Sequence, residues 1–566
     1  MIVRTSAVDR IARMHSLGWW SDVTVGDLFA RAVAAHPART AVVDPANRAA
    51  LGLGEPRRLT YAELASAVDA IAAQLLGLGL RNGDVVLAQL PNTWECVALY
   101  LAAARTGIVL SPVAMQYRRH ELDQVVALLE PKAIVTVPQF KGFDHADLGS
   151  ELAQACGAAL LLVGGAVERA HLLAGGPASA ADRALVAASA GPSADDVFTI
   201  CWTSGTEGAP KGVPRSHNQW IAISHAHFEA ARIAPGDMLL NPFPMINMAA
   251  IGGCFLSWLH AAGTLLLHHP FDPQVYLQQI AVERPQYAIA PPAVLNLLIR
   301  DEALLARVDL SSLRCIGSGS APLAPAMIAG FRERLGIEIV NLFGSNEGVS
   351  LASGPQEIAD PERRARYFPR FGRAEVPWPH RVSQSMETRL VDPASGAEIL
   401  EPGRPGELQV RGATVFDGYF KSPQMTAAAF TDDGFFRTGD LFEIAADEQG
   451  PRYYRFAGRH KQIIVRGGVK ISPDELDEIL AGCPGLLEGA VVGYPDELMG
   501  ERICAVVVPQ PGSDVTLEQI AAHFASRGVA VYKQPERVRA VAGLPRNPVG
   551  KVVRAELLRI AVAPPS

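Results

Sequence analysis

The sequence predicts an α/β fold: a large N-terminal domain of mixed, mostly parallel sheets and helices with a β-rich subdomain, followed by a small α+β domain. Three observations predict it. Short apolar runs alternate with helix-like segments over more than half of the chain, a pattern typical of parallel sheets. The composition changes after Met386. The 566 residues also exceed a single core, since a domain typically takes roughly 100–200 residues.

The predicted elements of the first part follow one another as helix and strand. A helix is expected over 61–78, and the segment 175–193, rich in Ala, Gly and Ser, predicts a surface helix and loop. Apolar runs predict buried strands at 85–90, 133–137, 160–163, 197–202, 264–268, 287–290 and 314–317.

The part after Met386 has a different pattern. Strands joined by Gly and Pro turns are expected at 388–391, 406–411 and 453–457, which predicts a β-rich subdomain of about 387–459. Elements at 472–480, 490–492, 503–509 and 517–526 then predict a compact α+β module. We therefore expect an N-terminal domain over 1–459 and a C-terminal domain over 460–566.

Composition limits the class of partner. The formal net charge of −7 offers no basic excess for binding nucleic acid or a membrane surface, so we expect small-molecule partners. The seven cysteines include no Cys-x-x-Cys pair, which argues against a disulfide framework or metal cluster and fits a reducing cytosol. No signal peptide or bilayer-spanning stretch is recognisable, and we expect a cytoplasmic protein without membrane insertion.

The segment TSGTEGAPKG at 203–212 has the composition of a phosphate-binding loop. Glycines expose backbone N–H groups, the hydroxyls of Thr203, Ser204 and Thr206 can donate, and Lys211 adds a positive charge. The preceding strand should bring this loop to a sheet edge, where α/β folds hold ligands. The segment is not a Walker loop, because Pro210 and Gly212 flank the lysine. Alone, it is equally compatible with a surface turn.

Four further clusters carry chemistry that suits a nucleotide. In FGSNEG, Glu347 could hold Mg²⁺ through an oxygen ligand, and in FRTGD, Asp440 could accept ribose hydroxyls. The segment GRHKQIIVRGG is dense in cations and glycine, and PRNPVGK places Lys551 in a proline-rich loop. Taken singly, a turn or a solvated side chain explains Glu347, Asp440 and Lys551 as well.

These five segments, in this order, resemble the signature motifs of the adenylate-forming superfamily, which includes acyl- and aryl-CoA synthetases, adenylation domains of peptide synthetases, and luciferases. The resemblance covers essentially the whole chain, and five motifs in the right order make coincidence remote. Segments such as GYFKSP at 418–423 also fall where that superfamily has similar ones.

The resemblance implies a role for each matching position. Lys551, Glu347 and Thr206 would be catalytic, with Glu347 also the metal ligand. Lys461 would be the hinge of a mobile C-terminal domain, and Gly468 would face the thiol tunnel. The implied nucleotide-binding residues are Thr203, Ser204, Gly205, Thr206, Lys211, Ser318, Gly319, Ser320, Asn341, Phe343, Gly344, Asp440, Arg459 and Lys551.

The implied activity is ligation of a carboxylic acid to CoA through an acyl-adenylate, with ATP, Mg²⁺ and CoA as cofactors and co-substrate. The segment resembling the acid-pocket wall contributes Met245, Ile246, Asn247, Ile251 and Gly252. Its aliphatic character favours a compact apolar acid, whether aromatic, alicyclic or short- to medium-chain. Asn247 could meet the acid or cap backbone. Asn346 replaces a Thr found in many relatives.

Other functions stay open on sequence alone. An aryl- or acyl-AMP ligase would load the pantetheine of a carrier protein instead of CoA, and luciferase chemistry uses the same scaffold. A non-catalytic nucleotide-binding protein should have lost Lys551, Glu347 or Asp440, all of which are present. The acid and a homodimeric state are undetermined.

Overall fold

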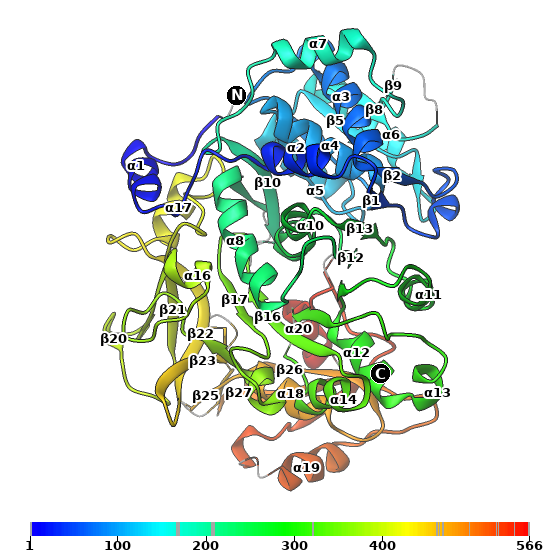
Figure 1. Cartoon of the computed structure of the whole chain (residues 1–566). Helices are drawn as coiled ribbons and strands as arrows, with labels where there is room; N and C mark the ends of the chain where they lie inside the picture. Colours follow the sequence, from blue (N-terminus) through cyan, green and yellow to red (C-terminus); the bar gives the residue numbers. More distant parts are fainter. Residues whose placement is uncertain are drawn as a thin grey trace.

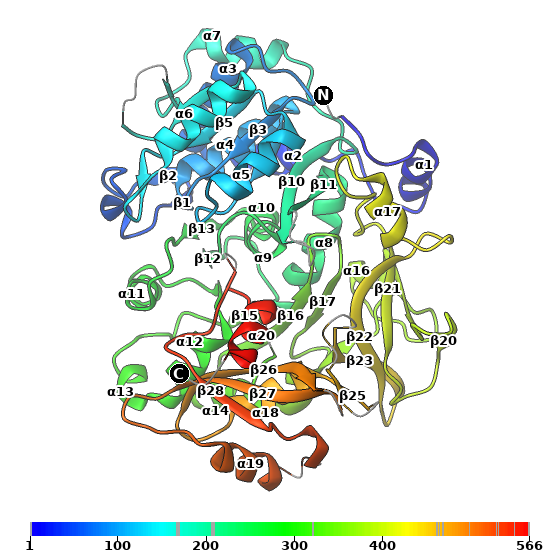
Figure 2. The ribbon, with the colours of Figure 1, turned by 180° about the vertical axis from the view of Figure 1, so that it is seen from behind.

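The fold is described from a computed structural model (Figures 1 and 2). It describes residues 3–165, 170–204, 210–319, 322–459, 462, 464–466, 469–496, 499–527, 529, 531–547 and 550–563. Within these ranges, no helix has both the length and the apolar character needed to cross a membrane. Both views place the N-terminal helices and sheet at one end, the C-terminal domain at the other, and the β-rich sheet along one side.

The first sheet has seven strands in the described part of the chain, and every neighbouring pair is parallel except β10 with β11. It contains four strands predicted from sequence: three differ from the prediction by one or two residues at the C-terminal end, and β8 is shifted by one residue at both ends. In spatial order the strands are β11 (Pro210–Ser216), β10 (Val197–Ser204), β4 (Val109–Pro112), β3 (Val85–Ala88), β5 (Ala133–Thr136), β8 (Ala159–Leu162) and β9 (His171–Leu172).

The second sheet has eight strands among the described residues and is parallel except at its two edges. The prediction of mixed, mostly parallel sheets is therefore confirmed. In spatial order the strands are β17 (Ser350–Ser353), β16 (Glu338–Gly344), β15 (Cys315–Gly319), β14 (Tyr287–Ile289), β12 (Met238–Asn241), β13 (Thr264–Leu267), β1 (Thr40–Val43) and β2 (Arg58–Thr60).

Helices begin where the sequence supplies caps. The Thr60 hydroxyl accepts from the N–H of Glu63, whose carboxylate accepts in return, and this capping box starts α3 close to the predicted residue. Helix α4 is buried on nearly all sides because it lies inside the largest core. The helices of this part include α2 (Val25–Ala35), α3 (Tyr61–Gly77), α4 (Trp94–Thr106), α5 (Arg119–Leu129), α6 (His145–Cys156), α7 (Ala180–Ala188), α8 (His217–Ala230), α11 (Pro273–Glu283), α12 (Pro292–Arg300), α14 (Pro325–Leu335) and α15 (Pro361–Arg366).

The β-rich part is a six-stranded antiparallel sheet in the described residues. The sheet begins earlier in the chain than the expected range of 387–459, because β18 pairs with β23, the C-terminal strand of this sheet. In spatial order it comprises β18 (Tyr367–Pro369), β23 (Gly450–Arg459), β22 (Phe436–Asp447), β21 (Gly406–Gly412), β19 (Met386–Val391) and β20 (Glu398–Ile399).

A separate small α+β domain follows, as predicted. Its helix α18 contacts the N-terminal domain, since Glu478 pairs with Arg366 (3.2 Å) and the Ala481 carbonyl accepts from Arg300 (3.4 Å). We propose that the two domains divide between 459 and 464, where one sheet ends and the next begins. The elements are β24 (Ile464–Arg466), β25 (Val469–Ile471), β26 (Leu486–Asp496), β27 (Gly500–Pro509), β28 (Arg537–Ala540), α18 (Pro473–Ala481), α19 (Leu517–Ser526) and α20 (Arg554–Val562).

Strand β11 was not predicted, because its two prolines argue against a strand. Pro210 and Pro214 are nevertheless accommodated, since β11 is the edge of the sheet and needs ladder hydrogen bonds on one side only. The glycine-rich segment is therefore the end of a β-hairpin: Thr203 pairs with Lys211, and Ser204 with Pro210.

A buried ionic cluster joins the two large sheets. Arg48 donates to both oxygens of Glu95 on α4 (2.8 and 2.6 Å) and lies 3.2 Å from Asp44, which follows β1. Asp44 also accepts from the backbone N–H of Trp94 (2.8 Å). All three charged side chains are buried, so the pairing must offset their desolvation.

We predict that Arg48→Met destabilises the protein by about 3–5 kcal/mol near neutral pH, because it leaves two buried carboxylates without their guanidinium. Burial raises the pKa of Asp44 to about 6, above the ordinary 3.8 of the unfolded chain. Arg48 lowers this pKa, so its removal raises the pKa of Asp44 further, and the variant takes up a proton at a pH where the wild-type carboxylate is still ionised; the deficit of the variant therefore shrinks as the pH falls to 6 and below. The defect should accordingly be smaller at pH 5.

Thermal and urea unfolding at both pH values measure this effect. Arg58→Met is the matched control, because Arg58 is half-exposed and pairs with Glu283 at the surface (2.7 Å). It should change stability by less than about 1 kcal/mol at either pH. Equal losses in the two variants would contradict the prediction.

Candidate functional site

The β10–β11 hairpin carries the sequence-predicted phosphate loop to the edge of the seven-stranded sheet. Thr203 and Lys211 stand opposite each other on the two strands, and both are half-buried. The predicted residues Gly205 and Thr206 lie outside the described residues, as does the side chain of Ser204. Lys211 is the part of the loop whose surroundings the structure defines.

Glu347 lies in the turn between β16 and β17. The carbonyl of Glu347 accepts from the N–H of Phe416 (2.9 Å), and the carbonyl of Asn346 accepts from Arg215 Nη1 (2.7 Å). Gly348 follows with φ of 120° and lies so close to the Thr414 carbonyl that a Cβ atom would overlap it. The turn is thus fixed by β11 on one side and by the 412–420 loop on the other.

Tyr419 connects Glu347 with Lys211. Its hydroxyl donates to Glu347 Oε1 (3.2 Å), and Lys211 Nζ lies 5.2 Å from the centroid of its ring. Burial, with a smaller contribution from the neighbouring Glu347 carboxylate, raises the pKa of Tyr419 far above its ordinary value, so the hydroxyl remains a donor. Sequence reasoning noted the GYFKSP segment but assigned no role to this tyrosine.

The surroundings of Glu347 fit a Mg²⁺ ion that also binds phosphate oxygens. Glu347 is half-buried, and Oε2 has no hydrogen-bond partner among the described residues. The same residues contain no group of three or more His, Cys, Asp and Glu side chains suited to a metal. Mg²⁺ is typically held by one or two carboxylates together with substrate phosphates and water, so a single carboxylate suffices here.

Arg215 is a fully buried cation behind this turn. Besides Asn346, it donates to the carbonyl of Gln219 (2.9 Å), and its guanidinium lies 5.1 Å from the ring centroid of Trp220. Its Nε has no hydrogen-bond partner within the described residues. Burial lowers the pKa of Arg215 to about 10, which leaves it charged at neutral pH. It therefore contributes positive potential close to Glu347.

The residues expected around adenine meet at the ends of two neighbouring parallel strands. Ser318 of β15 pairs with Asn341 of β16, and Gly319 pairs with Leu342. Ser318 Oγ donates to the Ala290 carbonyl (2.8 Å), and Asn341 Nδ2 donates to the carbonyls of Arg364 and Ala365 (3.1 and 2.9 Å). Both side chains therefore shape the strand ends. Gly344 ends β16, and Ser320 lies outside the described residues.

Phe343 extends from the end of β16 towards the β-rich sheet. Its ring packs against Phe442 (5.1 Å between centroids) and Phe456 (5.4 Å) on β22 and β23. Asp440 precedes Phe442 by two residues and stands opposite Arg459 in the backbone register of β22 and β23. The structure therefore brings the predicted ribose-binding strands next to the predicted adenine-binding strand.

The remaining predicted positions belong to the C-terminal domain and its boundary. The backbone N–H of Lys551 donates to Asn547 Oδ1 (2.9 Å), within a tight loop that precedes α20. The side chain of Arg459 lies outside the described part of the chain, and so do Lys461 and Gly468. Their roles stay predictions.

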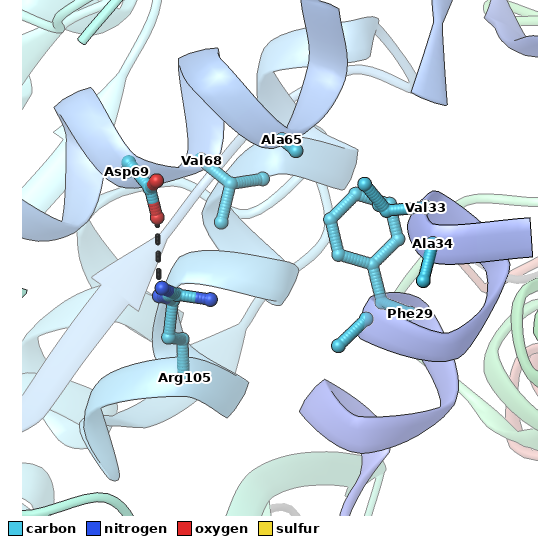
Figure 3. A pocket seen from close by; sticks show the side chains of 8 residues that line it. Phe29, Val33, Ala34, Ala65, Val68, Asp69 and Arg105 are labelled. Carbon is cyan, nitrogen blue, oxygen red and sulfur yellow. Dashed lines mark ion pairs between the residues drawn. The ribbon is translucent and has the colours of Figure 1, made fainter. Parts of the chain in front are cut away.

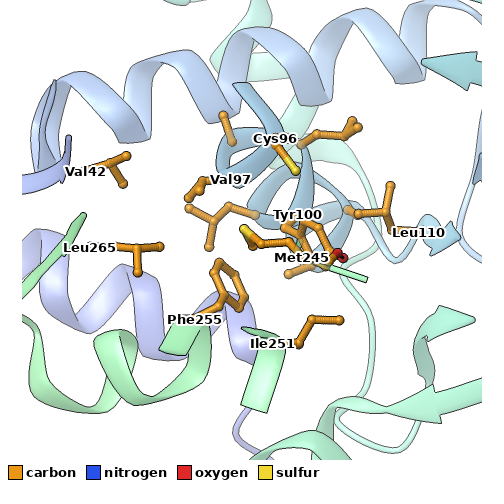
Figure 4. Close-up of a cluster of buried hydrophobic side chains, with 14 of the residues drawn as sticks. Val42, Cys96, Val97, Tyr100, Leu110, Met245, Ile251, Phe255 and Leu265 are labelled. Carbon is orange, nitrogen blue, oxygen red and sulfur yellow. Dashed lines mark hydrogen bonds between the residues drawn. The ribbon is translucent and has the colours of Figure 1, made fainter. Parts of the chain in front are cut away.

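The predicted acid-pocket wall combines a short helix, α9 (Met248–Ala250), with a π-helix, η2 (Ile251–Leu256). Asn247 Oδ1 accepts from the N–H of Ala250 (3.3 Å), so the capping role expected as one alternative for Asn247 is confirmed. Met245 and Ile251 are buried in the core beside Tyr100, whose hydroxyl donates to the Met245 carbonyl (Figure 4). Short π-helical segments occur frequently at functional sites.

Asn346 couples this wall to the Glu347 turn. Its Oδ1 accepts from the backbone N–H of Met248 (2.9 Å). The Met248 thioether lies against Gly344, where any side chain would overlap it, whereas a Cβ atom at Gly252 would make only ordinary contact with Met248. Ile246 lies two residues before Met248 and is half-buried. The acid-pocket wall and the carboxylate turn are therefore one connected unit.

A different pocket lies away from these residues (Figure 3). It opens between α2, α3 and α4, where Phe29, Val33 and Val68 form an apolar wall beside the Asp69–Arg105 ion pair (3.1 Å). None of the sequence-predicted site residues lines it.

Comparison with known proteins agrees with this arrangement. The AMP-binding enzyme family matches residues 29–420, and the AMP-binding enzyme C-terminal domain matches residues 475–551. A 2-hydroxy-7-methoxy-5-methyl-1-naphthoate–CoA ligase of Streptomyces carzinostaticus is 31% identical over 97% of this chain and 95% of its own. The medium-chain fatty-acid–CoA ligase of Escherichia coli K12 is 31% identical over 97% and 93%.

Among solved structures, ATP-bound MatB from Rhodopseudomonas palustris is 28% identical and superposes with a TM-score of 0.77 over 95% of this chain and 99% of that one. Apo MatB covers the same shares with a TM-score of 0.68. The overall arrangement of this chain is thus nearer to that of the ATP-bound protein.

We predict that Asn346→Ala lowers stability by about 1–3 kcal/mol, because the buried N–H of Met248 loses its acceptor. Thermal unfolding measures the loss. Asn296→Ala is the matched control, since Asn296 is half-buried on α12 and makes no side-chain hydrogen bond within the described residues; it should leave the melting temperature nearly unchanged. Identical melting curves for the two variants would rule out this coupling.

Proposed function

The chain belongs to the AMP-binding, adenylate-forming superfamily, and on that premise we propose that it is an ATP-dependent carboxylic acid–CoA ligase. Adenylate formation is the activity of the family, whereas the acid and the thiol acceptor are our inference. The observation that carries the proposal is that Tyr419 contacts both Glu347, through its hydroxyl, and Lys211, through its ring, beside the β10–β11 hairpin. It brings a cation and a metal-binding carboxylate together where a triphosphate would lie.

The first half-reaction requires an anion to approach an anion. The acid's carboxylate oxygen forms a bond to the α-phosphorus of ATP, the bond from that phosphorus to the bridging oxygen breaks, and pyrophosphate leaves. Positive charge must therefore surround the reacting groups. Lys211 is suited to the leaving pyrophosphate, together with donors from 203–206, and each such donor is worth roughly 3–4 kcal/mol in favourable sites. Mg²⁺ held by Glu347 would neutralise phosphate charge when bound.

The rest of the nucleotide would lie across the junction of the two sheets. Asp440 is suited to accept the ribose hydroxyls. Phe343 packs against Phe442, which follows Asp440 by two residues on β22. Lys551, supplied by the C-terminal domain, would approach the carboxylate and the α-phosphate. The likeness to ATP-bound MatB supports this assignment to the first half-reaction.

In the second half-reaction the CoA sulfur attacks the acyl carbon and AMP leaves. We infer that the C-terminal domain turns about Lys461 between the two steps, which withdraws Lys551 and brings Gly468 to the thiol channel. Two relatives whose names specify CoA ligation support CoA as the acceptor.

The acid is inferred to be compact and apolar. Met248 covers Gly344, and Ile251 is buried. The predicted wall therefore consists mainly of aliphatic side chains, together with the amide of Asn247, whose oxygen accepts one backbone hydrogen bond. An aromatic, alicyclic or short- to medium-chain acid suits such a wall. The two CoA ligases reported above act on an aromatic and an aliphatic acid by name, which leaves both classes in the proposal.

The proposal is tested by ATP–pyrophosphate exchange with benzoate, salicylate, cyclohexanecarboxylate and fatty acids of increasing length, followed by thioester formation with CoA. We expect exchange with at least one compact acid and a CoA thioester of the same acid. Exchange without any CoA thioester would contradict CoA as the acceptor and favour the pantetheine of a carrier protein. Absence of exchange with every acid would contradict the proposal.

We predict that Lys551→Ala lowers the rate of pyrophosphate exchange by roughly 100-fold or more, because one charged donor at the reacting centre is lost. Thioester formation from supplied acyl-adenylate should stay close to the wild-type rate, since Lys551 has withdrawn in that step. Lys533→Ala provides a matched control: Lys533 lies in the same domain and pairs with Glu475 (2.7 Å). Normal exchange by the Lys551 variant would remove the assigned role.

A further inference from the structure

We propose that Tyr419 is a positioning residue that holds Glu347 and Lys211 ready for Mg²⁺ and the triphosphate and keeps the two from pairing with each other. The proposal rests on the function proposed above. It deepens that function, because it assigns a role in nucleotide binding to a residue that carries no reacting atom.

The tyrosine ring is fixed on several sides. Its backbone N–H donates to Thr426 Oγ1 (2.9 Å), and its ring packs edge-on against Phe416 (5.0 Å between centroids). The next residue, Phe420, donates its N–H to the Gly212 carbonyl on β11 (2.9 Å). Tyr419 is thereby tied both to the hairpin that carries Lys211 and to the residue that binds the Glu347 carbonyl.

The loop that carries Tyr419 forms hydrogen bonds with the N-terminal segment, which precedes the 29–420 family match. Asp417 accepts from Arg10 (2.6 Å), from Ser6 (2.7 Å) and from Gln219 (2.8 Å). Trp20 Nε1 donates to the Ala413 carbonyl (3.2 Å). The position of Tyr419 is therefore set before any nucleotide binds.

Two opposite charges contact the same side chain, Tyr419, through different parts of it. Lys211 contacts the ring face, Glu347 accepts from the hydroxyl, and among the described residues neither takes part in an ion pair. Without the ring, the ammonium and the carboxylate could meet directly. Each would then be neutralised by its neighbour, and ATP would have to break that pair before binding.

The hydroxyl and the ring face have separable effects. The hydroxyl engages Oε1 of Glu347 and leaves Oε2 for the metal, so it fixes the direction in which the carboxylate points. The ring face attracts the lysine ammonium through its negative quadrupole. Phe in place of Tyr419 would remove only the first effect, whereas Leu would remove both.

The test is calorimetric titration of the full-length protein with MgATP, and separately with ATP in the presence of EDTA. We expect Tyr419→Phe to raise the Kd for MgATP about 3- to 10-fold, the value of one hydrogen bond, and to leave metal-free ATP binding unchanged. Tyr419→Leu should weaken binding of both forms by about 10-fold or more, because Lys211 becomes occupied by Glu347.

A second substitution isolates the pairing. In a Tyr419→Leu background, Glu347→Gln removes the charge that would capture Lys211, so affinity for metal-free ATP should recover towards the wild-type value. A tyrosine that merely supports packing predicts no such recovery. The matched control is Tyr494→Phe, because Tyr494 lies in the C-terminal domain with Arg537 over its ring (4.0 Å). It should bind both forms of ATP as the wild type does.

Wild-type affinities of Tyr419→Phe for MgATP and of Tyr419→Leu for metal-free ATP would overturn the proposal. If Tyr419→Leu fails to fold in thermal unfolding, Tyr419→Phe, which keeps the ring packing, still tests the hydroxyl, and a wild-type affinity for MgATP in that variant would overturn the proposal. The proposed function fails separately. If no acid supports pyrophosphate exchange in the wild type while MgATP affinity still depends on Tyr419, the positioning role stands without the ligase.

Discussion

The site depends on holding opposite charges close together without letting them neutralise each other. The proposed function requires Glu347 to stay available to a cation and Lys211 to phosphate, and both contact the side chain of Tyr419. Arg215 adds a third charge, fully buried and bonded to backbone carbonyls. Hydrogen bonds to carbonyls stabilise the guanidinium, and no carboxylate in the described part of the chain forms an ion pair with it, so the turn is fixed and the positive potential is kept.

The fold supplies this arrangement at the places where regular structure ends. The eight-stranded sheet presents the ends of β15 and β16, the seven-stranded sheet ends in the β10–β11 edge hairpin, and the antiparallel sheet contributes Asp440. Local departures from regularity gather there: prolines in β11, the π-helix η2 and the positive φ of Gly348. Such irregular backbone costs conformational free energy, which the burial of the large hydrophobic cores offsets.

Asn346 shows how the acid pocket and the nucleotide site are connected. Its backbone carbonyl binds Arg215, and its side chain binds the first residue of α9. A shift of the pocket wall is therefore transmitted to the residue next to Glu347. Met248 lies at this connection, with its thioether against Gly344.

The sequence by itself determined the fold class, seven of the fifteen strands that the structure describes in the two large sheets, the small C-terminal domain and the superfamily, because apolar periodicity and ordered motifs are local properties of the chain. It missed β11, since only a place at the sheet edge makes its prolines acceptable. Tertiary structure alone decided the contacts of Tyr419, Arg215 and Asn346. Their partners lie 72, 131 and 98 residues away in the chain, and no local pattern encodes such contacts.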